Sequence, residues 1–212
     1  MLIGDVSRQR NRMAGGWLSG LPEGPVLNAG CGPGVFEDSF PGSFLSRCVS
    51  LDLRYGMLAA AKEKHKGSFV QARGQSLPFC REAFSAVLLL DVIEHLPRED
   101  ASLFLSEAAR VLKPGGILVL SYPPYWVTAL FFDSSTHRAL KTSKIKKLLK
   151  GFIIEKVHTS AFFFYYLAKL AAAGGLGKER QWGSLLEKLK EWEFGFDFGI
   201  GFNAMIKAVK KA

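Results

Sequence analysis

The chain has 212 residues, 48% of them hydrophobic, and a formal net charge of +9. This length suits one domain with a well-buried core, residues 1–212, and is too short for two. The cysteines, Cys31, Cys48 and Cys80, form no CxxC pair, so they indicate neither a disulfide framework nor a zinc site. The first residues lack the long hydrophobic segment of a signal peptide, and we expect a cytoplasmic protein.

Strand-like and helix-like segments alternate from residue 25 onward. The apolar run 86–90 is uninterrupted, as expected for a central strand that is buried on both faces. We expect strands at residues 25–30, 47–53, 68–73, 84–92 and 116–123, and helices at residues 55–65 and 99–112. This order predicts an α/β protein with a parallel sheet that is covered by helices on both faces.

The alternation ends after residue 123. Residues 152–160 and 202–210 look like two further strands, and aromatic side chains gather between them, in "AFFFYYLAKL" and "EWEFGFDFGIGF". No repeat or low-complexity linker separates this part from the rest. We therefore interpret residues 25–123 as a cofactor-binding core and residues 124–201 as an acceptor-side elaboration of the same domain.

The excess positive charge is concentrated in residues 138–156, where lysines are frequent and Glu155 is the one acidic residue. Ile145, Leu148 and Leu149 fall at helical spacing among the lysines, which predicts an amphipathic helix with a cationic outer face. Such a face is either ordinary solvated surface or a contact for an anionic membrane or a polynucleotide. The sequence leaves both interpretations open.

The stretch "VLNAGCGPG" ends a predicted strand with Gly30, Gly32 and Gly34. Glycines at such a turn expose backbone N–H groups and let a nucleotide-like ligand pack directly on the main chain. A dinucleotide fingerprint has the pattern GxGxxG, but Val35 stands where its third glycine would be, which disfavours a pyrophosphate. Asp52 ends the next strand, where a carboxylate can accept hydrogen bonds from ribose hydroxyls.

These motifs, in this order, resemble the class I S-adenosylmethionine-dependent methyltransferases, and among them the type 11-like branch that acts on quinone precursors, lipids and other small molecules. The resemblance rests on "VLNAGCGPG", "LDLRYGML", "DVIEHL" and "RVLKPGGILVLSYP", and covers residues 25–123. It implies a Rossmann-like, seven-stranded, mostly parallel sheet with the last strand antiparallel, helices on both faces, and a helical, aromatic cap insertion.

The resemblance also implies S-adenosylmethionine as the cofactor. Asp52 would then hold the ribose, and Asp91 would lie beside the methionine part. The residues that it implies for cofactor binding are Gly30, Cys31, Gly32, Asp52, Leu53, Gly74, Gln75 and Asp91.

Three features depart from the family pattern. Asn28 stands where the family usually has Asp, which replaces an acidic contact near the cofactor with a neutral one. Arg73 and Gly74 stand where the family often has Asp and Ala against the adenine. The helix after the glycine loop is also short, because Pro41 follows closely. We expect these departures to affect cofactor affinity more than the fold.

Methyl transfer from a sulfonium is an in-line displacement, in which alignment alone can supply on the order of 7 to 11 kcal/mol. A general base helps only if the acceptor is a hydroxyl or a phenol, and histidine suits that role. The candidates are His95, which follows the fourth strand, and His137, in the acceptor-side segment. Asp91, Glu94 and His95 are close enough in sequence to suggest metal ligands, but we expect no metal.

The sequence therefore predicts a methyltransferase for a small acceptor, and the aromatic segments favour an apolar or aromatic one, such as a lipid or a quinone-like molecule. With the lysine-rich face, they also suggest peripheral contact with a membrane. Two alternatives stay open, a non-catalytic S-adenosylmethionine-binding module and an RNA methyltransferase. We expect no nucleic-acid partner, because the aromatic residues do not interleave with the lysines.

Overall fold

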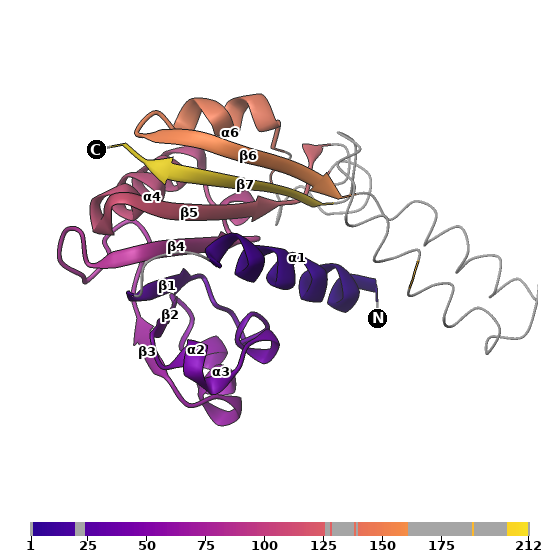
Figure 1. Cartoon of the computed structure of the whole chain (residues 1–212), viewed down its shortest axis with the longest axis vertical. Coiled ribbons are helices and arrows are strands. Elements are labelled where there is room, and N and C mark those ends of the chain that lie inside the picture. The colour runs from indigo at the N-terminus through magenta and orange to yellow at the C-terminus, as the bar shows by residue number, and fades with distance from the viewer. Residues whose placement is uncertain are drawn as a thin grey trace, which may run out of the picture.

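The computed structural model describes residues 2–19, 24–125, 128, 138, 140–160, 188 and 203–211. Its strands form one sheet in the order β3-β2-β1-β4-β5-β7-β6 (Figure 1). The strands are β1 (Val26–Ala29), β2 (Cys48–Asp52), β3 (Ser68–Gln71), β4 (Phe84–Leu90), β5 (Leu112–Tyr122), β6 (Phe152–Ser160) and β7 (Asn203–Lys210). The helices are α1 (Leu2–Leu18), α2 (Gly42–Leu45), α3 (Tyr55–Lys64), α4 (Arg98–Val111) and α6 (Thr142–Leu148), with 3-10 turns η1 (Glu37–Ser39) and η2 (Ile93–His95).

Strands β1 to β5 pair in parallel, whereas β7 runs antiparallel to both β5 and β6. Parallel neighbours need a crossover, and α3 and α4 provide it between β2 and β3 and between β4 and β5. The predicted fold class, a mostly parallel seven-stranded sheet with its last strand antiparallel, is therefore confirmed.

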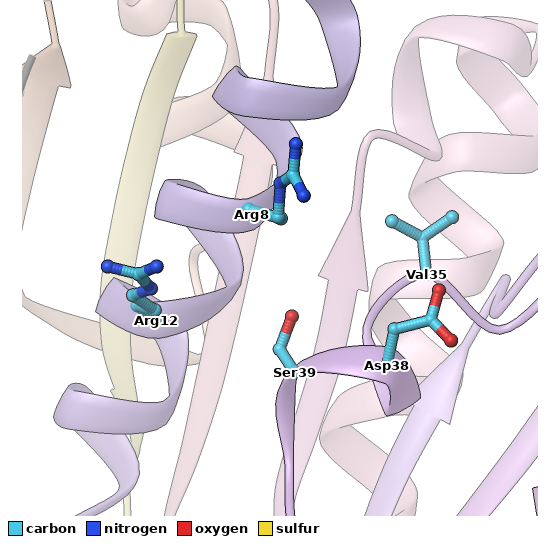
Figure 2. Close-up of a pocket in the computed structure, with 5 residues that line it drawn as sticks. All are labelled: Arg8, Arg12, Val35, Asp38 and Ser39. Carbon is cyan, nitrogen blue, oxygen red and sulfur yellow. The ribbon is translucent and has the colours of Figure 1, made fainter. Parts of the chain in front are cut away.

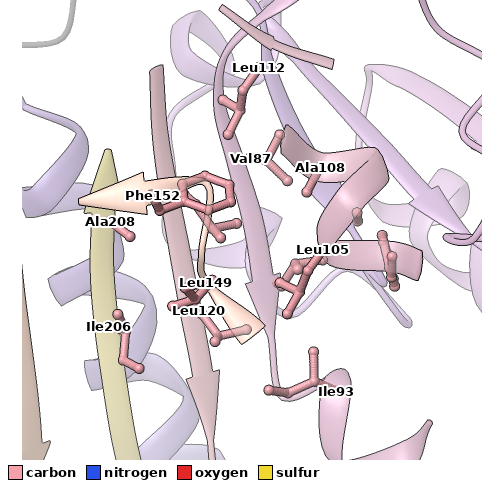
Figure 3. Packing of buried hydrophobic residues seen from close by; sticks show 14 of the residues in the cluster. Val87, Ile93, Leu105, Ala108, Leu112, Leu120, Leu149, Phe152, Ile206 and Ala208 are labelled. Atoms are coloured by element: carbon pink, nitrogen blue, oxygen red, sulfur yellow. The ribbon is translucent and has the colours of Figure 1, made fainter. Parts of the chain in front are cut away.

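Strand β4 is buried along its whole length, as its continuous apolar sequence predicts. Its side chains alternate between two cores, because successive residues of a strand point to opposite faces. Leu88 and Leu90 belong to the core under α1, and Val87 and Leu89 to the core on the other face. Figure 3 shows this second core, in which Leu105 and Ala108 of α4 pack beside Val87.

Helix α1 lies across one face of the sheet, and α4 and α6 cover the other (Figure 1). The β/α alternation does not predict α1, because this helix precedes the first strand. Its Ala14 and Leu18 are buried against the sheet, with Met13 and Trp17 packed beside them, so the apolar residues recur at helical spacing.

The lysine-rich helix is present but shorter than its segment, since α6 ends at Leu148 and β6 begins at Phe152. The turn after the glycine loop is short, as expected, because η1 covers only Glu37–Ser39. Most of the predicted aromatic cap falls outside the described residues. Within them, no helix is long and apolar enough to cross a membrane.

Candidate functional site

The central strands β2, β1 and β4 end side by side, at the carboxyl edge of the sheet. Ligands of open α/β sheets bind at this edge. The strand order brings together three of the predicted site residues, Gly30 after β1, Asp52 at the end of β2 and Asp91 after β4. The register pairs Ala29 with Leu51, so the glycine loop begins level with Asp52.

The three glycines of the loop all have positive φ, +86° at Gly30, +55° at Gly32 and +86° at Gly34. A Cβ at Gly30 would lie 2.4 Å from a methyl of Val92, and one at Gly34 would lie 3.0 Å from the ring of His65. A Cβ at Gly32 would meet nothing within 4 Å. The absence of a side chain at Gly30 and Gly34 leaves room for Val92 and His65. At Gly32, by contrast, the main chain is exposed on an open side of the loop, where a ligand can contact it.

Asp52 is 6% exposed and fastens the loop to the end of β2. Its Oδ2 accepts a hydrogen bond of 2.9 Å from the Gly32 N–H, and its Oδ1 accepts one of 2.9 Å from the Arg54 N–H. A carboxylate oxygen has a second lone pair, so Asp52 can accept ribose hydroxyls while it holds Gly32. The carboxylate and the exposed main chain of the loop therefore form one unit.

A buried polar cluster lies beneath the loop. Asn28 donates from Nδ2 to Oε1 of Glu37 at 2.9 Å, and the Ser50 hydroxyl donates to the same oxygen. Glu37 is 2% exposed, and its Oε2 has no hydrogen-bond partner among the described residues. Glu37 therefore supplies an acidic group beside Asn28. The sequence does not predict this role of Glu37, because only the fold brings η1 against β1.

Cys31 and Cys48 lie next to this cluster and are both buried. Burial, with the negative charge of Glu37 as the second cause, raises the pKa of the Cys31 thiol far above its usual range. The same two causes raise the pKa of Cys48 to about 12. Both thiols are therefore neutral at physiological pH, and Cys31 takes part in the site through packing rather than as a nucleophile.

Asp91 holds a φ of +55°, which is uncommon for a residue with a side chain and typical of functional sites. Its N–H donates to the hydroxyl of Ser121 at 3.0 Å, and that hydroxyl donates back to Asp91 Oδ1 at 2.6 Å. Asn203 Nδ2 also approaches Oδ1, at 3.4 Å. The ends of β4, β5 and β7 thus fix the carboxylate, whose side chain is still 33% exposed.

Arg10 of α1 reaches this carboxylate and forms an ion pair with Asp91 Oδ2. Its side chain is only 7% exposed, and its Nε and Nη2 donate to Asn11 Oδ1 at 3.1 and 2.9 Å. Asn11 in turn donates from Nδ2 to the backbone oxygen of Val35 at 2.8 Å. The sequence analysis did not identify Arg10. The one signal that could have done so is the helical spacing of the apolar residues in α1, which predicts a helix that packs on the sheet.

Glu94 is a second buried carboxyl at this edge, with 1% of its surface exposed. Burial, and after it the charge of Asp91, raises the pKa of Glu94 well above its usual range, while Arg10 lowers it. Its Oε2 has no hydrogen-bond partner in the part of the chain that the structure describes. Its burial and the charge of Asp91 thus both favour the neutral form of the Glu94 carboxyl.

The structure describes one of the two predicted general bases. His95 follows Glu94 in η2, and its side chain is exposed at the rim of the carboxyl edge. His137 lies outside the described residues. Among those residues, no group of three or more histidine, cysteine, aspartate or glutamate side chains is arranged to hold a metal ion.

The remaining predicted cofactor residues flank Asp52. Leu53 follows it directly and is 53% exposed, which suits an apolar contact with a ligand. Gly74 and Gln75 are half-buried in the loop after β3. A Cβ at Gly74 would lie 2.2 Å from the ring of Phe104, so packing against α4 explains this glycine without a ligand.

A cavity of about 500 Å³ lies between α1 and the segment after the glycine loop (Figure 2). Its lining residues are Arg8, Arg12, Val35, Asp38 and Ser39. Arg8 and Arg12 stand one turn apart on α1, roughly opposite Arg10 around the helix axis. The cavity thus adjoins the glycine loop at Val35, on the far side of α1 from the Arg10–Asp91 pair.

Comparison with known proteins shows that part of the chain is similar to methyltransferases. Residues 27–120 match the model of a family of methyltransferase domains. An uncharacterized methyltransferase of Mycobacterium marinum is 34% identical over 113 residues, which cover 50% of this chain and 43% of the relative. The chain therefore matches less than half the length of that relative.

Solved structures share the fold at low identity. An S-adenosylmethionine-dependent methyltransferase from Archaeoglobus fulgidus superposes with a TM-score of 0.66 at 18% identity, covering 98% of this chain and 94% of that one. A magnesium protoporphyrin IX methyltransferase from Synechocystis, with S-adenosylmethionine bound, gives 0.61 at 19% identity and covers 97% and 81%. A cyclase, SpnF, gives 0.63 at 19% identity and covers 95% and 81%.

The cyclase shows that this fold alone does not determine the reaction. The family match is more specific than the fold, and two of the structures that share the fold are an S-adenosylmethionine-dependent methyltransferase and a methyltransferase with S-adenosylmethionine bound. Residues 27–120 therefore resemble a methyltransferase domain in sequence, and the chain shares the fold of these methyltransferase structures.

Proposed function

We propose that this protein is an S-adenosylmethionine-dependent methyltransferase that acts on a small, apolar or aromatic acceptor. One observation carries the proposal. The main chain at Gly32 is open to a ligand, and its N–H donates a hydrogen bond of 2.9 Å to the carboxylate of Asp52. A nucleoside needs both groups, a hydrogen-bond acceptor for its sugar and a close approach to the backbone.

Each residue of the site has a distinct part in this function. When bound, S-adenosylmethionine supplies a methyl group on a positively charged sulfur. Asp52 accepts the ribose hydroxyls, the loop at Gly32 packs against the cofactor, and Asp91 faces its methionine part. Burial and the neighbouring charge of Asp91 raise the pKa of Glu94, which disfavours a second negative charge at the carboxyl edge of β4.

The acceptor class follows from the composition of residues 124–201. This segment is rich in aromatic side chains, which commonly line sites for apolar molecules. In the described part of the segment, the Tyr125 ring is 48% exposed, with the Lys141 ammonium 5.1 Å from its centre. An apolar acceptor such as a lipid or a quinone-like molecule fits this composition.

A non-catalytic binding module is the second candidate. Arg73 favours it, because it stands where the related methyltransferases often have an acidic residue against the adenine. The two candidates differ in turnover but not in cofactor binding. Release of S-adenosylhomocysteine in the presence of apolar phenols and hydroxylated lipids would support the enzyme.

Titration calorimetry with S-adenosylmethionine tests the binding site itself. We expect Asp52→Asn to weaken binding by about 1 to 3 kcal/mol, because the change removes a charged acceptor of hydrogen bonds. The matched control is Glu63→Gln, which makes the same chemical change at an exposed position of α3 and should leave affinity unaltered. Equal affinities of the wild type and Asp52→Asn would show that the ribose does not lie at Asp52.

A further inference from the structure

We propose that the cavity between α1 and the segment after the glycine loop binds the phosphate group of a small phosphomonoester, at a site separate from that of the cofactor. The cavity has a volume of about 500 Å³, which lies within the range of small-molecule sites. A phosphate ion alone would fill only a small part of this volume, so the ligand carries a larger organic body. This inference goes beyond the proposed function and does not depend on it.

Two guanidinium groups give the cavity its positive charge. Arg8 and Arg12 line it from successive turns of α1 (Figure 2), and both residues are exposed. Within the described residues, the Arg12 guanidinium makes no hydrogen bond or ion pair. A guanidinium presents its N–H groups in a planar fork that matches phosphate oxygens. A phosphate has enough oxygens to accept from both forks, whereas a carboxylate suits one.

The opposite wall of the cavity adds one hydroxyl and one carboxylate. Ser39 Oγ accepts a hydrogen bond of 3.4 Å from Asn11 Nδ2, so its O–H is still available as a donor. Asp38 Oδ1 lies 2.9 Å from His65 Nε2, which leaves Oδ2 for a hydroxyl on the body of the ligand. With two arginines against one aspartate, the lining has a net positive charge that favours an anion.

The stability of α1 does not account for the two arginines. Like charges four residues apart on a helix repel each other and destabilise it. The core beneath α1 is built from Ala14, Leu18 and their apolar neighbours, and neither arginine belongs to it. A bound phosphate would offset the repulsion between Arg8 and Arg12, and it therefore explains their placement better than the helix alone does.

The cavity is distinct from the cofactor site. Neither Asp52 nor Asp91 is among the described residues that line it. Arg10, the partner of Asp91, lies two positions from each of the two arginines, and two residues turn an α-helix by about 200°. Arg8 and Arg12 therefore lie on the other side of α1, and a phosphate between them leaves the carboxyl edge of β4 free.

Titration calorimetry with inorganic phosphate and with glycerol phosphate tests the site, in a phosphate-free buffer of low and constant ionic strength. We expect the wild type to bind both, and not to bind glycerol. Arg8→Gln and Arg12→Gln should each weaken phosphate binding about 10-fold or more, as for the loss of a charged hydrogen-bond partner. The matched control is Arg81→Gln, which removes the same charge from an exposed position before β4 and should bind as the wild type does.

Three further measurements refine the test. Arg12→Lys keeps the positive charge without the fork and should lose less affinity than Arg12→Gln. Saturating S-adenosylhomocysteine should leave the affinity for phosphate unchanged. Vesicles that contain phosphatidic acid, whose headgroup is a phosphomonoester, distinguish two sources of the ligand. Sedimentation that Arg12→Gln abolishes would indicate a lipid, and binding of the soluble ester alone would indicate a metabolite.

Several results would overturn the proposal. A wild type that bound neither phosphate nor the ester would do so, and so would equal losses in Arg12→Gln and Arg81→Gln, which would reduce the effect to net charge. Binding of inorganic phosphate alone would contradict the phosphomonoester. Competition by S-adenosylhomocysteine would show that the cavity belongs to the cofactor site. A protein that bound phosphate but not S-adenosylmethionine would contradict the proposed function and leave this site in place.

Discussion

At the scale of single residues, the contact with Glu37 changes how Asn28 is interpreted. In the sequence, Asn28 looks like the loss of an acidic residue that the family usually has. In the structure, the Asn28 amide donates to the Glu37 carboxylate, which also accepts from Ser50. The acidic group at this place in the fold therefore comes from η1 rather than from β1, and the effect of Asn28 on cofactor binding stays a prediction.

This relocation predicts the effect of exchanging the two side chains. Asn28→Asp would place two buried carboxylates in contact, and we expect it to lower the free energy of unfolding by about 3 kcal/mol or more. Adding Glu37→Gln should restore most of the stability, because the amide then at position 37 can donate to the carboxylate at position 28, in the reverse direction. Urea unfolding of both single variants and the double variant measures the coupling. Additive effects would show that residues 28 and 37 do not share a hydrogen bond.

At the scale of elements, α6 presents its lysines to solvent while its apolar side is already covered. Ile145 and Leu149 are buried in the core, whereas Lys144, Lys146 and Lys147 are exposed. Helix α6 therefore has no free apolar face to insert into a bilayer. If this protein contacts a membrane here, as the sequence suggests, the contact is electrostatic.

Replacing Lys144, Lys146 and Lys147 by Gln tests that contact. With about 1 kcal/mol for each lysine near an anionic surface, the triple variant should bind phosphatidylserine vesicles roughly 100-fold more weakly at low salt. The control is a triple variant at Lys62, Lys64 and Lys66, which removes the same charge from an exposed segment elsewhere. Equal binding of both triple variants, or no sedimentation of the wild type, would exclude α6 as the membrane contact.

At the scale of the whole molecule, the buried carboxyl of Glu94 affects how stability depends on pH. Burial holds its folded pKa well above 4.5, so the folded protein keeps a proton that the unfolded chain releases. The folded state therefore loses stability as the pH rises above the unfolded pKa toward the folded one. Gln is always neutral, so Glu94→Gln removes this loss.

We expect Glu94→Gln to leave the melting temperature unchanged near pH 4 and to raise it progressively toward neutral pH. Each kcal/mol gained would appear as about 2 to 4 °C for a chain of this size. Thermal unfolding of the wild type and the variant across this pH range gives the difference directly. A difference that did not change with pH would show that folding does not raise the pKa of Glu94.

The sheet could be predicted from the sequence because its signals are local. The unbroken apolar run of β4, the glycines after β1 and the alternation of strands and helices each occupy a few consecutive residues. The site residues that follow directly from those signals, Gly30, Gly32, Asp52 and Asp91, meet at one edge. Their roles in cofactor binding stay predictions.

The contacts of Arg10 and Glu37 could not be predicted, because they join distant parts of the chain. The Arg10–Asp91 pair spans 81 positions, and the bond between Ser50 and Glu37 spans 13. Neither residue belongs to a motif, so only the path of the backbone brings it to its partner. His137 and most of the aromatic segment lie outside the described residues, and their proposed roles await direct test.

The position of β7 in the sheet has a consequence for the order of assembly. β6 pairs with β7, which in turn pairs with β5, so residues 203–210 join two strands that are made earlier. Until those residues leave the ribosome, β5 presents an open edge and β6 lacks the neighbour that it has in the finished sheet. The nascent chain therefore passes through a stage in which two unpaired strand edges are open to binding by a chaperone.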